Sequence, residues 1–323
     1  MVSLEDIRAA AGRIEPVIVR TPLISSPVLD EVTGGRILLK AENLQRTGSF
    51  KIRGAYNMLS QLSTDDAKHG AVAFSSGNHA QAVAAAGTML GIKTTIVMPA
   101  DTPSIKIDNT RRLGGDTVLY DRYTEDREEI AQRIADESGA TIVPPYNHDH
   151  IIAGQGTAGL ETMEQCESLG LTPDQVLINC SGGGLTAGFA VAVNALASDA
   201  GIYPVEPEDF DDTRRSIRSG SMEVNDPDAR TICDALMSSP PGDVTFAINQ
   251  RLATDVLTVS DDDVRDAIRF AFRHLKLVVE PGGAVSLAAI LSGKLEVAGQ
   301  VTVAILSGGN VDPALFASIQ EAG

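Results

Sequence analysis

Residues 175–196 read QVLINCSGGGLTAGFAVAVNAL, and this stretch decides the fold. An apolar run at 175–179 leads through three consecutive glycines into an Ala- and Val-rich segment that we expect to be helical. Successive N–H groups of such a turn converge at the positive end of a helix dipole and can hold a phosphate. The alternative is a tight turn that needs glycine only for positive φ. The stretch is neither a P-loop, since no Lys-Ser or Lys-Thr follows, nor a GxGxxG fingerprint.

The same order, a short apolar run followed by a helical segment, recurs on both sides of this stretch. We expect strands at 36–40, 71–74, 94–98, 117–120, 141–143, 175–179, 201–205, 256–259 and 301–306. We expect helices at 79–89, 104–113, 126–137, 156–169, 185–197, 261–274 and 284–291. This alternation is typical of an α/β protein with mostly parallel sheets flanked by helices.

The length of the chain and a Pro-rich loop segment within it predict a division into two parts. At 323 residues the chain is long enough for two domains or one large one. Three strand–helix repeats between Ala71 and Val143 can form a small open sheet of their own. The segment 144–148 (PPYNH) then returns the chain to the larger part.

Composition excludes several classes of protein. The 26 Lys and Arg against 43 Asp and Glu give a net charge of −17, which disfavours binding to nucleic acid or an anionic membrane. The three cysteines are widely spaced without a CxxC, so neither a disulfide framework nor a zinc site is indicated. We see no signal peptide and no membrane span, and we expect a cytoplasmic protein in a reducing compartment.

Three more segments combine small and polar residues where a strand should lead into a helix, and parallel sheets bind ligands at such ends. They are 48–51 (GSFK), 75–79 (SSGNH) and 307–310 (SGGN). Lys51 lies in a small, apolar setting, and a desolvated lysine can form a Schiff base with a carbonyl compound. Without the glycine loop, a solvated surface lysine would be the better interpretation, because most lysines are of that kind.

The 75–79 segment offers hydroxyls and an amide before a helix N-terminus. Its backbone N–H groups can hold a substrate carboxylate, while Asn78 donates to a ring oxygen. The alternative is an ordinary helix cap. Ser307 follows an apolar strand, and its hydroxyl can face a ligand or cap the next turn.

Taken together and in this order, these segments resemble the fold-type II pyridoxal-phosphate enzymes, specifically the threonine/serine dehydratase and serine racemase family. The resemblance covers nearly the whole chain and also includes 39–45 (LKAENLQ), 152–157 (IAGQGT), 280–284 (EPGGA) and 311–312 (VD). It implies two open, mostly parallel twisted sheets of the tryptophan-synthase-beta type. It also implies a large cofactor-binding domain at 1–47 and 145–323, and a small mobile domain at 48–144 that closes over the substrate.

The resemblance assigns roles to individual residues. Lys51 and Ser76 would be catalytic, Lys51 as the Schiff-base lysine and general base. The residues that would bind pyridoxal 5′-phosphate are Phe50, Lys51, Asn78, Ser181, Gly182, Gly183, Gly184, Leu185 and Ser307. Those that would bind the substrate are Ser75, Asn78, His79 and, by a looser match to an arginine of the racemases, Arg133.

The implied reaction is elimination of water from L-threonine, L-serine or a related 3-hydroxy amino acid, which gives a 2-oxo acid and ammonia. A serine or aspartate racemase is an alternative. In the racemases, the position that matches Ser76 has a hydroxyl that can protonate the opposite face of the α-carbon. A 3-hydroxyaspartate dehydratase is a further alternative. Residues 239–246 (SPPGDVTF) look like the dehydratases and favour elimination. The expected partners are a small amino acid and further copies of the chain, in a dimer or tetramer.

An acidic run at 206–212 follows the predicted strand 201–205 and is by itself typical of a solvated loop. In the related enzymes, carboxylates at the positions of Glu206 and Asp212 and a backbone carbonyl at the position of Phe210 bind magnesium or calcium. Oxygen ligands suit these hard cations, and Mn²⁺ is a further candidate. Phe210 departs from the small residue usual there, which puts the loop geometry in question.

Overall fold

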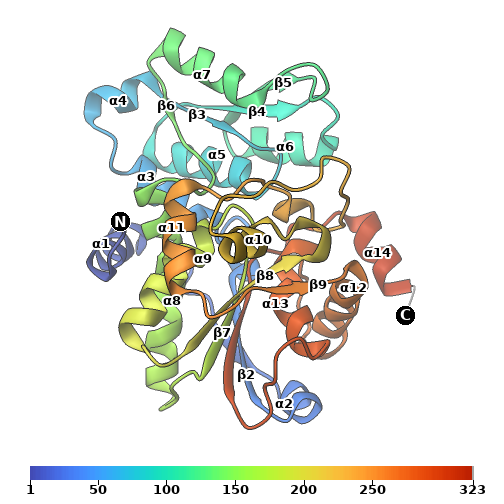
Figure 1. The fold of residues 1–323 in the computed structure, drawn as a ribbon. Coiled ribbons are helices and arrows are strands. Elements are labelled where there is room, and N and C mark those ends of the chain that lie inside the picture. The colour runs from blue at the N-terminus through green and yellow to red at the C-terminus, as the bar shows by residue number, and fades with distance from the viewer. Residues whose placement is uncertain (322–323) are drawn as a thin grey trace.

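Two sheets organise residues 1–321, which are the residues that the computed structural model describes (Figure 1). The six-stranded sheet has the order β1-β2-β10-β7-β8-β9 and the four-stranded sheet the order β5-β4-β3-β6. All neighbours run parallel except β1 and β2. The strands are β1 (Leu23–Ser25), β2 (Arg36–Ala41), β3 (Ala71–Phe74), β4 (Thr94–Pro99), β5 (Gly115–Tyr120), β6 (Thr141–Ile142), β7 (Gln175–Asn179), β8 (Gly201–Pro207), β9 (Leu257–Val259) and β10 (Val301–Leu306).

Helices cover both faces of the six-stranded sheet. Successive residues of its central strands point to opposite faces, and apolar side chains on both faces have to be buried. In β7, Leu177 packs into a core with the helices of the C-terminal region, whereas Val176 and Ile178 pack into a second core with α8 and α9. The helices of this part are α1 (Leu4–Ile14), α2 (Pro27–Thr33), α8 (Asp149–Ser168), α9 (Gly184–Leu196), α10 (Asp212–Ser219), α11 (Asp243–Leu252), α12 (Asp261–Phe270), α13 (Pro281–Leu291) and α14 (Pro313–Glu321). Short turns complete it at η1 (Glu42–Leu44), η2 (Glu208–Phe210), η3 (Asp234–Leu236) and η4 (Ala271–Leu275).

The four-stranded sheet lies at the top of Figure 1 and has its own cores. One core joins β3 and β4 to α3 and α5, and the other joins the opposite face of β3 and β4 to α7. The helices of this part are α3 (Lys51–Leu59), α4 (Thr64–His69), α5 (Asn78–Leu90), α6 (Ser104–Arg112) and α7 (Arg127–Ser138). The expected small sheet is therefore confirmed, while the domain boundaries 1–47, 48–144 and 145–323 stay a prediction.

The α/β class is confirmed, and every strand expected from the sequence is present. The sequence prediction did not include β1, whose three residues carry no clear apolar pattern. The expected helix at 261–274 is not a single α-helix. The α-helix α12 ends at Phe270 and is followed by the π-helical segment η4, and the chain leaves helical geometry at Lys276, which has φ +61°. Within residues 1–321, no helix combines the length and the apolar character that crossing a membrane requires.

Candidate active site

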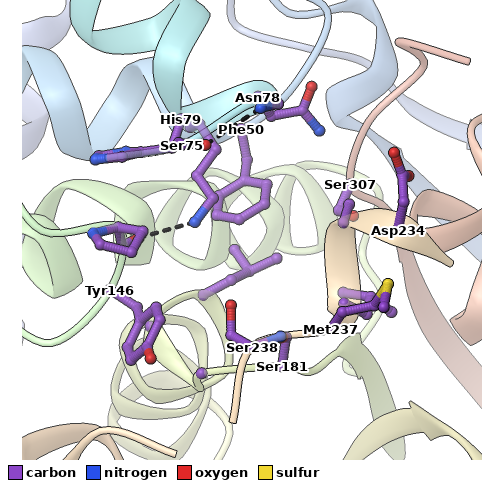
Figure 2. Close-up of a pocket in the computed structure, with 18 of the residues that line it drawn as sticks. Phe50, Ser75, Asn78, His79, Tyr146, Ser181, Asp234, Met237, Ser238 and Ser307 are labelled. Atoms are coloured by element: carbon purple, nitrogen blue, oxygen red, sulfur yellow. Dashed lines mark hydrogen bonds between the residues drawn. The ribbon is translucent and has the colours of Figure 1, made fainter. Parts of the chain in front are cut away.

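A pocket lies where both sheets present the carboxyl ends of their strands, and backbone contacts hold its two central segments together. Ser49 and Gly308 form an antiparallel bridge, and the Phe50 N–H donates to the Ser307 carbonyl over 3.1 Å. The segment that carries Lys51 is thereby fixed beside the segment that carries Ser307. Both residues line one pocket together with the 75–79 turn and the glycine loop (Figure 2).

Lys51 is the first residue of α3, and its amine has no acidic partner among the contacts that the structure records in residues 1–321. Its Nζ donates to the Pro145 carbonyl over 2.8 Å and lies 5.2 Å from the centre of the Phe50 ring. Burial lowers the pKa of the Lys51 amine to about 8. Near physiological pH the neutral amine, which a nucleophile or a general base requires, is therefore still the minor form, but it is far more abundant than in an ordinary lysine.

The glycine loop forms a cradle that has no room for side chains. Gly183 has φ +89°, and a Cβ at Gly182 would lie 2.3 Å from the Tyr146 ring. The Thr245 hydroxyl fixes the loop by donating to the Gly182 carbonyl over 2.6 Å. Helix α9 begins at Gly184 without a side-chain cap, so the N–H groups of its first turn are available to an anion. Ser181 and Leu185 flank this cradle in the pocket wall, and the set suits a phosphate.

Ser307 is 5% exposed at the end of β10, and an asparagine orients its hydroxyl. The Asn179 amide donates to Ser307 Oγ over 2.9 Å and to the Gly282 carbonyl over 3.0 Å. Because Ser307 Oγ accepts this bond, its own proton is left for an acceptor atom of a ligand in the pocket. Sequence reasoning missed Asn179; its signal is a buried amide directly after the apolar residues 176–178, at the carboxyl end of a strand.

Asn78 begins α5 and is held between two polar side chains. Its Nδ2 donates to Glu280 Oε1 over 2.6 Å, and its Oδ1 accepts from Asn310 Nδ2 over 2.7 Å. The second hydrogen of Asn78 Nδ2 is left for an acceptor atom of a ligand in the pocket. Burial, followed by the charge of Asp234, raises the pKa of Glu280 to about 7. Glu280 and Asn310 lie in segments noted in the sequence, but their support of Asn78 was not predicted.

The structure brings Ser75, Ser76 and His79 into the same pocket as Lys51. His79 Nε2 lies 2.8 Å from the Val143 carbonyl, and burial, followed by the Lys51 charge, lowers the pKa of its imidazole to about 3. His79 is therefore neutral and donates from Nε2. The backbone N–H groups at the start of α5 remain as the donors suited to a substrate carboxylate.

Arg133 is not among the described residues that line the pocket. It lies exposed on α7, whereas Arg127, the first residue of that helix, lines the pocket and lies 5.6 Å from the Phe74 ring centre. Six residues along a helix rotate a side chain by about 240°, so Arg127 and Arg133 cannot share one face. The structure therefore has Arg127, and not the expected Arg133, in the wall of the pocket.

The three expected metal ligands lie at one end of β8. Glu206 and Asp212 are buried, and Phe210 is 5% exposed in η2. The Glu206 carboxylate accepts from the Thr213 N–H over 3.1 Å and the Arg214 N–H over 2.9 Å. Asp212 Oδ1 accepts from Asn225 Nδ2, while its buried Oδ2 has no hydrogen-bond partner.

The electrostatics of this pair follow from its burial. Burial, followed by the Asp212 charge, raises the pKa of Glu206 to about 8, and burial raises the pKa of Asp212 to about 6. In the described part of the chain, no group of three His, Cys, Asp or Glu side chains could hold a metal. Side chains alone therefore supply two ligands here, and main-chain oxygens would have to supply the rest.

Comparisons with known proteins agree with this geometry. The family described as "Pyridoxal-phosphate dependent enzyme" matches residues 14–308. The chain is 44% identical over 317 residues to an L-threo-3-hydroxyaspartate ammonia-lyase from Pseudomonas sp, with 98% of each chain covered. It is 40% identical to the serine racemase of Schizosaccharomyces pombe, covering 95% of this chain and 94% of the relative. The crystal structure of a threonine deaminase from T.th. superposes with a TM-score of 0.91 at 43% identity, covering 96% of this chain and 99% of that one.

Proposed function

The chain belongs to the family of pyridoxal-phosphate-dependent enzymes, and from this premise we propose that it eliminates water from L-threonine, L-serine or a related 3-hydroxy amino acid. The products are a 2-oxo acid and ammonia. The observation that carries the proposal is the Lys51 amine, which has a pKa of about 8 and faces the same pocket as the glycine cradle and Ser307.

The residues of the pocket fit the cofactor. Lys51 would hold it covalently, the loop from Ser181 to Leu185 would hold its phosphate, and Phe50 would pack against its ring. Ser307 and Asn78 each have a hydrogen left over, which suits the ring nitrogen and the ring oxygen, respectively. When bound, pyridoxal phosphate supplies an electron-withdrawing ring that stabilises negative charge at the α-carbon.

The chain's own residues then perform the proton transfers. N–H groups of the 75–79 turn bind the substrate carboxylate, and the Lys51 amine removes the α-proton as general base. His79 adds no charge because it is neutral. Ser307 offers the ring nitrogen a hydroxyl rather than a carboxylate, which leaves the ring a weaker electron sink and suits elimination over long-lived carbanion chemistry.

Racemisation of serine or aspartate is a second candidate, and the position of Ser76 favours it. Ser76 lines the same pocket as Lys51, so its hydroxyl is a candidate to return a proton to the α-carbon. An enzyme with both activities would use Lys51 in each and Ser76 only in racemisation.

A substrate panel tests the proposal. L-Threonine, L-serine and L-threo-3-hydroxyaspartate are each incubated with the cofactor-loaded protein, and 2-oxo acid, ammonia and the D-enantiomer are measured. We expect 2-oxo acid from at least one of them, and Ser76→Ala should abolish racemisation while sparing elimination. Ser76→Thr, which keeps a hydroxyl, is the matched control. A protein that binds no cofactor and releases no 2-oxo acid or D-enantiomer would overturn the proposal.

We also infer that Glu206, Asp212 and the main-chain carbonyl of Phe210 bind Mg²⁺, Ca²⁺ or Mn²⁺. Two buried carboxylates without a cation between them are costly, and Asp212 Oδ2 has no partner in the structure. Oxygen-only ligands suit these ions.

Domain mobility, oligomeric state and cellular compartment complete the proposal. We propose that residues 48–144 form a mobile domain, since they hold a complete sheet of their own and rejoin the rest through the Pro-rich segment 144–148. We propose a homodimer or homotetramer in the cytoplasm. The three free, buried cysteines support a reducing compartment.

A further inference from the structure

An ion pair in the wall of the pocket joins the two parts of the chain. Lys106 comes from α6, beside the four-stranded sheet, and Asp234 comes from η3, on the side of the six-stranded sheet. Lys106 Nζ lies 2.6 Å from Asp234 Oδ2, and both residues line the pocket. In Figure 2, Asp234 lies on the same side of the pocket as Ser307.

Few cations are available to a substrate in this pocket. Of the described residues that line it, those with cationic side chains are Lys51, Lys106 and Arg127, since His79 is neutral. Lys51 is reserved for the cofactor, and the 75–79 turn supplies donors for the α-carboxylate. Arg127 rests over the Phe74 ring. Lys106 is the cation that is already bound to a carboxylate in the pocket wall.

The same wall disfavours a second negative charge. Asp234 and Glu280 both line it, and Asp234 acts on Glu280 strongly enough to help raise the pKa of that carboxyl. A substrate with a carboxylate on its β-carbon is therefore repelled here unless it gains a cation. Lys106 can supply that cation by exchanging the Asp234 carboxylate for the carboxylate of the substrate.

We propose that Lys106 binds the second carboxylate of a dicarboxylic 3-hydroxy amino acid in exchange for Asp234, and that this ion pair sets the preference between dicarboxylic and monocarboxylic substrates. This inference rests on the proposed function and specifies its substrate class. Asp234 competes with the substrate for Lys106, so the two residues have opposite effects on selectivity. A structural latch between the two sheets would instead affect all substrates alike.

The first test measures kcat/KM of the cofactor-loaded enzyme for L-threo-3-hydroxyaspartate and for L-threonine. We expect Lys106→Met to lower the ratio of the two values about tenfold, the loss typical of one charge-assisted hydrogen bond. Asp234→Asn should raise the same ratio severalfold, because it removes the competitor of the substrate. Arg122→Met, which breaks the 2.7 Å Arg122–Asp101 pair outside the pocket lining, should leave the ratio unchanged.

The second test uses ligands that do not react, so it does not depend on the proposed reaction. Dissociation constants of succinate and butyrate are measured on the loaded enzyme from the shift in cofactor absorbance. Succinate should bind more weakly to Lys106→Met and more tightly to Asp234→Asn, with butyrate unaffected by either. Equal changes for both ligands, or selectivity lost in Arg127→Met but kept in Lys106→Met, would overturn the inference. Failure of the proposed function would instead appear as no turnover of any 3-hydroxy amino acid by the parent enzyme.

Discussion

Two cations lie two residues apart on α3 and have opposite surroundings. Lys51 is bound by a carbonyl alone, that of Pro145, and one side of it opens to the pocket. Arg53 is fully buried and is held by two carboxylates, with Nε 2.8 Å from Glu42 Oε2 and Nη1 2.9 Å from Glu161 Oε1. Burial lowers the pKa of Lys51 to about 8. Burial acts in the same direction on Arg53, but Glu42 and Glu161 outweigh it and raise the pKa of Arg53.

The difference shows that pairing, and not burial, decides the direction of the pKa shift, since both cations are buried and only Arg53 is paired with carboxylates. Lys40 completes the network around Arg53, since its Nζ lies 2.8 Å from Glu161 Oε2. The network thus contains two cations and two anions, and it ties β2, η1, α3 and α8 together. Lys51 starts the helix that this network anchors. The enzyme places an unpaired amine on a rigid support, which is how a reactive group keeps its position.

The largest effect should come from removing the unpaired amine. Lys51→Ala should lower turnover by about 10⁴-fold, because the general base and the covalent anchor of the cofactor are lost together. The free energy of unfolding should not fall, because Lys51 makes one hydrogen bond and no ion pair, and burial of its charge is itself a cost. Initial rates and urea unfolding check the two halves of this prediction. Turnover close to the parent value would mean that another residue takes the proton.

Removing Arg53, the paired cation, should lower the free energy of unfolding. Arg53→Met leaves Glu42 and Glu161 buried without their main partner and should cost about 3–5 kcal/mol in the free energy of unfolding. Arg20→Met breaks the exposed Arg20–Glu164 pair of similar length, 2.8 Å, and should cost no more than about 1 kcal/mol. Urea unfolding of both variants measures the contrast. Equal losses would show that the buried network contributes no more than a surface pair.

The pH dependence of stability separates the two cations further. In the cofactor-free protein the folded-state pKa of Lys51 is about 8, below the ordinary value of 10.5, so the unfolded chain binds more protons between these two values. The penalty of burying the charge is therefore complete below pH 8 and is lost as the pH rises to 10.5. Lys51→Met removes that penalty and should be more stable than the parent below pH 8, by on the order of 3 kcal/mol. Unfolding measured from pH 6 to 10.5 should show this advantage shrinking; a constant difference would contradict it.

The sequence predicted the strands and the glycine loop because their signals are local. Apolar runs and contiguous glycines can be read within a few residues, and Gly182, Gly183 and Ser307 line the same pocket as Lys51. The Arg53 network could not be read this way, since Glu161 lies 108 residues from Arg53 and the contact depends on how α3 packs against α8.

Arg133 shows a different limit of the sequence prediction. The chain carries two arginines six residues apart on α7, and only the rotation of that helix against the sheet decides which one reaches the pocket. The order of motifs along the sequence does not specify how α7 is rotated about its axis, so it could not predict which arginine lines the pocket.

The smallest effect should come from a third buried group, the carboxyl pair Glu206 and Asp212, whose pKa values are raised by burial. Glu206 and Asp212 contrast with Lys51, because they are buried carboxyl groups for which we propose an ion from solution as the partner. If they bind Mg²⁺, free Mg²⁺ at about 100 times its dissociation constant should stabilise the fold by about 2.7 kcal/mol. Thermal unfolding with Mg²⁺ and with EDTA measures this shift. Asp212→Asn should remove the shift, while Asp209→Asn, which takes the same charge from an exposed position in the same loop, should keep it. A shift of equal size in Asp212→Asn and the parent would place the ion elsewhere and leave the two carboxylates as an unpaired cost of the fold.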